Sequence, residues 1–95
     1  MNNVRIPQIT SLKTAIDIYY KHNELSSKEI VELFGNKCYT TIQKLKNKAR
    51  AEAEAEGKPI FNAANVNTQA AYQAWGLDIN DLETRYKKLK ELDLN

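Results

Sequence analysis

Apolar residues recur every three or four positions in separate stretches of this chain, which is the spacing of amphipathic helices. Residues that favour turns, chiefly Gly, Asn and Pro, lie between these stretches. The pattern predicts helices over about residues 11–22, 26–34, 38–56, 68–75 and 78–92. We therefore expect an all-α, or mainly α, fold of about five helices.

Local start and stop signals support these boundaries. Ser26 and Glu29 have the spacing of a capping box, in which each side chain bonds the backbone N–H of the other. Gly35 follows the apolar face of the second helix and can adopt the positive φ that ends a helix. Thr68 is a candidate cap for the fourth helix, and Gly76 is a candidate terminator.

The chain has the length of a single small domain, over residues 1–95. Pro7 indicates an extended arm over residues 1–9, where Val4 and Ile6 alternate as in a short edge strand. We expect a three-helix core over residues 10–57 and a C-terminal pair of helices over residues 68–95. Between them, residues 58–67 form either a loop or a short β-wing.

The third predicted helix is amphipathic, with a narrow apolar stripe of Cys38, Ile42, Leu45 and Ala49. At 100° per residue these positions share one face, which we expect to pack against the first two helices. The opposite face consists of small polar, amide and basic side chains: Thr40, Gln43, Lys44 and Asn47.

This polar face has the chemistry of a helix that reads base edges in the DNA major groove. Gln43 and Asn47 match the donor and acceptor of adenine, Lys44 can donate to guanine, and Thr40 can bond a base or contact the thymine methyl. The polar and charged residues around them are candidates for phosphate contacts. These are Ser27, Lys28, Lys37, Tyr39, Thr41, Lys46, Lys48 and Arg50.

Charge is concentrated in the same segment. The whole chain has a formal charge of only +2. From Lys37 to Arg50 there are five basic residues and no acidic one. A concentrated basic segment in an otherwise slightly acidic chain favours a polyanionic partner, although solvated lysine-rich helices are also common.

The segment from Ser26 to Ala49 resembles the helix-turn-helix motif of small bacterial and phage DNA-binding proteins. The resemblance rests on the capped helix, on Phe34-Gly35 at its end, and on Thr41-Ile42 with Leu45 in the following helix. The turn is longer by one residue than in the familiar motif, which affects the register of base contacts. The resemblance implies a transcriptional regulator or an excisionase-like recombination accessory that binds double-stranded DNA.

The remaining residues indicate no catalytic chemistry, cofactor or metal. No nucleophile elbow, phosphate-binding loop or dinucleotide fingerprint is present, so we expect no enzyme. His22 is the only histidine, and a metal site needs several ligands. Cys38 is the only cysteine, which excludes an intrachain disulfide and is consistent with the cytoplasm. No leader segment or membrane-spanning run is apparent.

A second function class rests on the last predicted helix. Leu82, Tyr86 and Leu89 follow the 4,3 spacing of a packed seam. This seam could hold a protein partner or a second copy of the chain, which makes a protein-interaction module the alternative to DNA binding. Binding of single-stranded DNA or RNA ranks lower, because most aromatic residues lie at packing positions.

Overall fold

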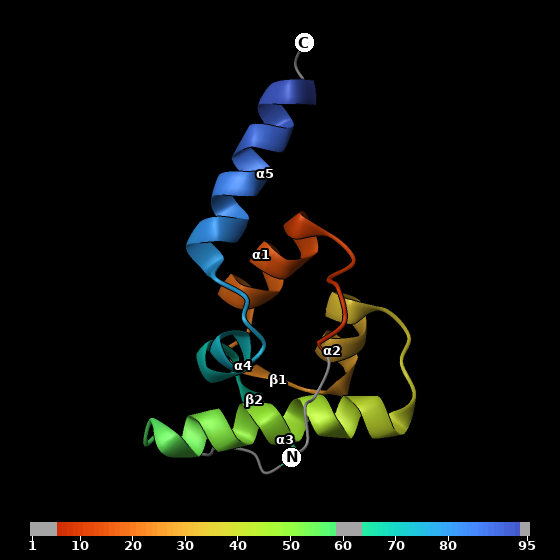
Figure 1. Cartoon of the computed structure of the whole chain (residues 1–95), viewed down its shortest axis with the longest axis vertical. Coiled ribbons are helices and arrows are strands. Elements are labelled where there is room, and N and C mark those ends of the chain that lie inside the picture. Colours follow the sequence, from red (N-terminus) through yellow and green to blue (C-terminus); the bar gives the residue numbers. More distant parts are fainter. Residues whose placement is uncertain (1–5, 59–63, 94–95) are drawn as a thin grey trace.

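Helices form most of the structure, as the spacing of apolar residues predicts (Figure 1). The computed structural model describes residues 6–58 and 64–93. Its helices and strands, in chain order, are α1 (Leu12–Lys21), β1 (Glu24–Leu25), α2 (Ser27–Phe34), α3 (Tyr39–Ala55), β2 (Val66–Asn67), α4 (Thr68–Ala74) and α5 (Ile79–Asp93). The mainly α fold class with a short β element is therefore confirmed.

The capping box at the start of α2 is present in full. Ser26 donates its backbone N–H to Glu29 Oε1 at 2.8 Å, and its hydroxyl donates to the same oxygen at 2.6 Å. The Ser26 hydroxyl oxygen also accepts the N–H of Lys28 at 3.3 Å. These bonds satisfy backbone donors that a helix N-terminus otherwise leaves unpaired.

Gly35 ends α2 with a φ of 86°, a conformation that favours glycine. The segment before α1 runs past the C-terminal end of α2. Thr10 donates its N–H to the carbonyl of Leu33 at 2.8 Å and its hydroxyl to the carbonyl of Glu32 at 2.9 Å. The Thr10 methyl lies 3.4 Å from where a Cβ at Gly35 would stand. The positive φ therefore favours glycine here, whereas a Cβ would make only an ordinary van der Waals contact with the Thr10 methyl.

The two short strands form an antiparallel pair in which Glu24 lies opposite Asn67 and Leu25 opposite Val66. Of the predicted loop or wing, residues 59–63 lie outside the described residues, and the end of the segment forms β2. Residues 1–5 of the predicted arm also lie outside them, and residues 6–9 contain no strand. Asn67, rather than Thr68, caps α4, because its side-chain oxygen accepts the N–H of Ala70 at 2.9 Å.

Helix α4 and its C-cap residue Trp75 contribute two large buried side chains to the core. Tyr72 is 1% exposed and donates its hydroxyl to the carbonyl of Ala15 in α1 at 2.6 Å. Trp75 is also buried, and its indole Nε1 donates to the carbonyl of Leu45 in α3 at 3.0 Å. The Trp75 ring meets Phe34 of α2 edge to face, with centroids 5.3 Å apart.

Helix α3 packs mainly against α4 and β2, and less against α2. The prediction that its apolar stripe packs against the first two helices is therefore only partly right. The reason is that α4 returns to α3 through a long connection, and sequence-local reasoning does not anticipate such a contact. The buried residues Ile42, Leu45 and Ala49 confirm the rotational phase of the helix.

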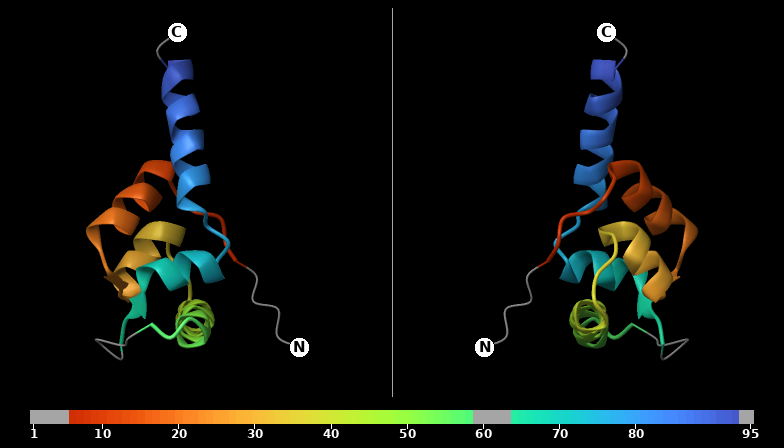
Figure 2. Two further views of the ribbon diagram at one scale, coloured as in Figure 1. Left: turned by 90° about the vertical axis from the view of Figure 1, so that its left-hand side faces the viewer. Right: turned by 90° about the vertical axis from the view of Figure 1, so that its right-hand side faces the viewer.

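Helix α5 packs against α1 near its start and then extends beyond the other helices (Figure 2). Leu82 is buried, whereas Leu89 is 48% exposed. The predicted seam is thus packed within the domain only at its beginning. Within residues 6–58 and 64–93, no helix is long and apolar enough to cross a bilayer.

We predict that Ser26→Ala lowers the free energy of unfolding by about 1 kcal/mol near neutral pH, because it removes the cap of α2. Burial tends to raise the Glu29 pKa, but the bonds from Ser26 outweigh it and lower the pKa below 4.5. The stabilisation by ionised Glu29 is therefore present above that value and is lost as pH falls through the folded-state pKa. Urea unfolding of both proteins across this pH range should show their difference shrinking in acid. A difference that does not change with pH would contradict the role of ionised Glu29.

Candidate nucleic-acid interface

Helix α3 lies along one side of the molecule, at the end opposite the tip of α5 (Figure 1). Figure 2 views α3 nearly along its axis, and the other described helices all lie to one side of it. Among the described residues, no helix or strand covers the surface of α3 that faces away from α4. This open surface is the face that the sequence assigns to base contacts.

Three of the four predicted base-contacting residues, Thr40, Lys44 and Asn47, are exposed on this open surface. Gln43 is half-buried on the same helix. Arg50 Nη1 donates to Asn47 Oδ1 at 3.4 Å. Thr40, Lys44 and Asn47 are spaced by four and three residues, so they form one continuous row.

The N-terminal edge of α3 carries further exposed groups. Lys37 is exposed, and Tyr39 is 77% exposed. Cys38 is exposed as well, so its assignment to the buried stripe is wrong: the helix begins one residue later, and Cys38 stands at the N-cap position. Thr41 is half-buried, and its Oγ1 lies 3.2 Å from the Cys38 sulfur. Hydrogen bonding by Thr41 lowers the pKa of the Cys38 thiol.

Of the other predicted phosphate-contacting residues, Ser27, Lys28 and Lys48 are exposed, and Arg50 is half-buried. Ser27 and Lys28 begin α2, where the positive end of the helix dipole favours an anion. Lys48 lies on α3 one turn beyond Lys44. The structure thus keeps these groups accessible on two neighbouring helices.

Lys46 does not belong to this surface, which corrects its assignment as a phosphate contact. Its side chain is 6% exposed, and its Nζ donates to the carbonyl of Ala64 at 3.0 Å. Burial lowers the pKa of Lys46, and repulsion from Arg50 adds to the shift. The sequence spacing indicates that Lys46 is buried. Lys46 lies one helical turn after Ile42 and two helical turns before Ala53, at the edge of the apolar stripe.

The far end of α3 has the opposite charge. Glu52 is half-buried, and Glu54 and Glu56 are exposed. A hydrogen bond with Glu56 raises the pKa of Glu52. Helix α3 therefore changes from basic to acidic along its length, and only its first three turns offer a surface suited to an anion.

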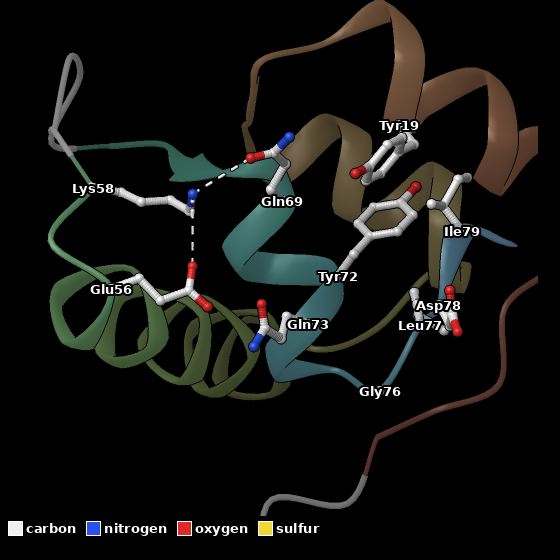
Figure 3. A pocket seen from close by; sticks show the side chains of 10 residues that line it. All are labelled: Tyr19, Glu56, Lys58, Gln69, Tyr72, Gln73, Gly76, Leu77, Asp78 and Ile79. Atoms are coloured by element: carbon white, nitrogen blue, oxygen red, sulfur yellow. Dashed lines mark hydrogen bonds and ion pairs between the residues drawn. The ribbon is translucent and has the colours of Figure 1, made fainter.

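A pocket of about 500 Å³ lies beside α4, on a different part of the molecule (Figure 3). Its charged wall is already paired: Lys58 Nζ lies 3.7 Å from Glu56 Oε1 and donates to Gln69 Oε1 at 3.4 Å. The hydroxyl of Tyr72, in the floor, is bonded to the core. In the described parts of the chain, no group of three or more His, Cys, Asp or Glu side chains could hold a metal ion.

Trp75 is one of the aromatic residues at packing positions, and the sequence does not reveal its direct bond to α3. Trp75 donates to the Leu45 carbonyl and, together with the buried apolar residues of α3, helps to hold the inward side of this helix. Its spacing from Ala71 and Tyr72 indicated a buried side chain, but nothing local indicated the acceptor.

Comparison of the chain with family models, curated proteins and solved structures gives no match.

We predict that an amine-reactive acylating reagent modifies Lys44 and Lys48 rapidly and Lys46 slowly in the folded protein. Burial blocks access to the Lys46 amine, although its lowered pKa by itself would favour reaction. Mass spectrometry of proteolytic fragments reports the order of modification, and the same reaction in denaturant should remove the difference. Equal rates for Lys44 and Lys46 in the folded protein would show that Lys46 faces solvent.

Proposed function

We propose that this chain binds double-stranded DNA by placing the N-terminal half of α3 in the major groove. The observation that carries the proposal is the open row of Thr40, Lys44 and Asn47 on a helix whose opposite side is held in the core. An α-helix fits the major groove, and amide, hydroxyl and ammonium groups can bond base edges there. We infer a transcriptional regulator or a recombination accessory, acting in the cytoplasm.

The distribution of charge along α3 supports entry of its N-terminal half, rather than its C-terminal end, into the DNA groove. The exposed cations Lys37, Lys44 and Lys48 lie in the turn before α3 and in its first turns, whereas Glu54 and Glu56 lie at its end. Phosphates attract the first group and repel the second. The positive end of the helix dipole adds to the attraction. The first three turns of α3 would therefore enter the groove, and its acidic end would stay outside.

The arrangement of α2 and α3 supports the helix-turn-helix resemblance as part of the proposal. Four residues, 35–38, separate the two helices, one more than the predicted helix boundaries leave between them. The exposed N-terminal turn of α2, with Ser27 and Lys28, could bond the DNA backbone while α3 reads bases. Half-buried Gln43 would then be a minor contributor beside Lys44 and Asn47.

We predict that Lys44→Glu weakens binding to duplex DNA by about tenfold to a hundredfold, because it replaces an attractive contact in the groove with a repulsive charge. Fluorescence anisotropy with labelled random duplexes, at several salt concentrations, measures the loss. The matched control is Lys87→Glu, which makes the same charge change on exposed α5. Equal weakening by both variants would show that the effect comes from net charge alone. Unchanged binding by a folded Lys44→Glu protein would refute this interface.

A second prediction concerns sequence preference. Asn47→Ala should relax the preference for adenine at one position of the selected site, since a bidentate amide contact is worth about 1–3 kcal/mol of discrimination. Selection from a random duplex library by the natural chain and by the variant would reveal it. Gln73→Ala, an exposed amide on α4, is the control and should select the same site as the natural chain. Selection of the same sequence by Asn47→Ala would remove Asn47 from base readout.

A further inference from the structure

Lys46 is a buried cation that the proposed DNA contact does not use. Its Nζ donates to the carbonyl of Ala64 at 3.0 Å, across eighteen positions of the sequence. Burial lowers the pKa of this amine, so the fold holds its charge at a cost in stability. An apolar side chain of similar length would avoid that cost. What the charged side chain supplies instead is one strong, directional bond at a fixed place on α3.

This bond and the bond from Trp75 meet α3 on the two sides of its buried stripe. At about 100° per residue, Ile42 and Ala49 mark the middle of the stripe. Leu45 lies on one side of this line and Lys46 on the other. Trp75 Nε1 donates to the Leu45 carbonyl at 3.0 Å. Two directional bonds, one from α4 and one to the segment before β2, thus hold consecutive residues of α3.

The acceptor of the Lys46 bond precedes a segment that the rest of the domain holds. Val66 is buried and lies opposite Leu25 in the pair of β1 and β2. Thr68 then donates its hydroxyl to the carbonyl of His22 at 2.7 Å. Lys46 therefore ties α3 to an anchored stretch of chain that is joined to the connection between α1 and α2.

We propose that Lys46 is a positioning residue for base readout, because it helps to set the rotation of α3 that turns the row of Thr40, Lys44 and Asn47 outward. This row lies opposite the midpoint between Leu45 and Lys46. The inference rests on the proposed function, since the row acts only if α3 enters the groove.

A small rotation of α3 would be enough to disturb such readout. A side-chain tip lies about 5–6 Å from the helix axis, so a roll of about 20° moves it by about 2 Å. Groups that bind a ligand must be held to within about 0.5 Å of their productive positions. Apolar packing is non-directional and resists such a roll less than a hydrogen bond does. The bonds at Leu45 and Lys46 together supply the missing direction.

DNA binding by Lys46→Met tests this role, because methionine is similar in length but has no ammonium group. The probes are the duplex that the natural chain selects from a random library and the same duplex with the selected site scrambled. The variant should lose roughly tenfold of its discrimination between them. Its affinity for the scrambled duplex should not change, because the exposed cations of α3 remain. A folded variant with full discrimination would overturn the inference.

Lys48→Met is the matched control, since it makes the same chemical change on the exposed surface of α3. It should weaken binding to both duplexes alike and reduce the salt slope by about one. The same pattern in a folded Lys46→Met protein would indicate a direct phosphate contact and would overturn the positioning role. Circular dichroism checks folding. If the methionine variant does not fold, Lys46→Gln, with its shorter amide, is judged by the same criteria.

Hydrogen exchange without DNA tests the tether separately from the proposed function. In Lys46→Met, the amides that join β1 and β2 should exchange faster by roughly tenfold, and those at the start of α2 should not change. Unchanged exchange at β2 would overturn the tether. A natural chain that binds neither duplex would instead contradict the proposed function, and the role of Lys46 in readout with it, whatever the exchange shows.

Discussion

The buried hydrogen bond from Trp75 to the backbone of α3 is the contact on which the open surface depends. The indole Nε1 donates to the Leu45 carbonyl at 3.0 Å, on the inward side of the helix. A directional bond of this kind, together with the packing of a large ring, fixes the rotation of α3 about its own axis. Tyr72, one turn earlier on α4, bonds the carbonyl of Ala15 and ties the same short helix to α1. Because α4 covers one side of α3, the row that contains Lys44 and Asn47 lies on the opposite, open side.

The open surface of α3 and the exposed apolar stripe of α5 lie far apart on the molecule. Helix α3 lies along one end, and α5 projects from the other (Figure 1). Leu82 is the last residue of the α5 stripe that the domain buries, and the stripe then continues into solvent. The exposed part of this stripe therefore lies away from α3.

Sequence reasoning succeeded where the determining interactions are local. The capping box of Ser26 and Glu29, the end of α2 at Gly35 and the phase of Ile42 and Leu45 all depend on residues within one or two turns. It failed for Cys38 and Lys46. Cys38 extends the apolar spacing but stands before the first turn of α3, so no helical neighbour covers it. Lys46 looks like one more cation in a basic segment, but it is buried, and its ammonium donates to the carbonyl of Ala64, which is distant in sequence.

The sequence by itself determined that the chain is mainly helical, approximately where its helices begin and end, and which face of α3 is polar. Helical periodicity and capping are properties of neighbouring residues, so they can be recognised before any tertiary contact is known. Only the tertiary structure decided which element covers α3, that Lys46 is removed from its surface, and that α5 leaves the core after Leu82. These outcomes depend on contacts between segments far apart in the chain, such as Trp75 with Leu45, and on how much apolar surface one small domain can cover.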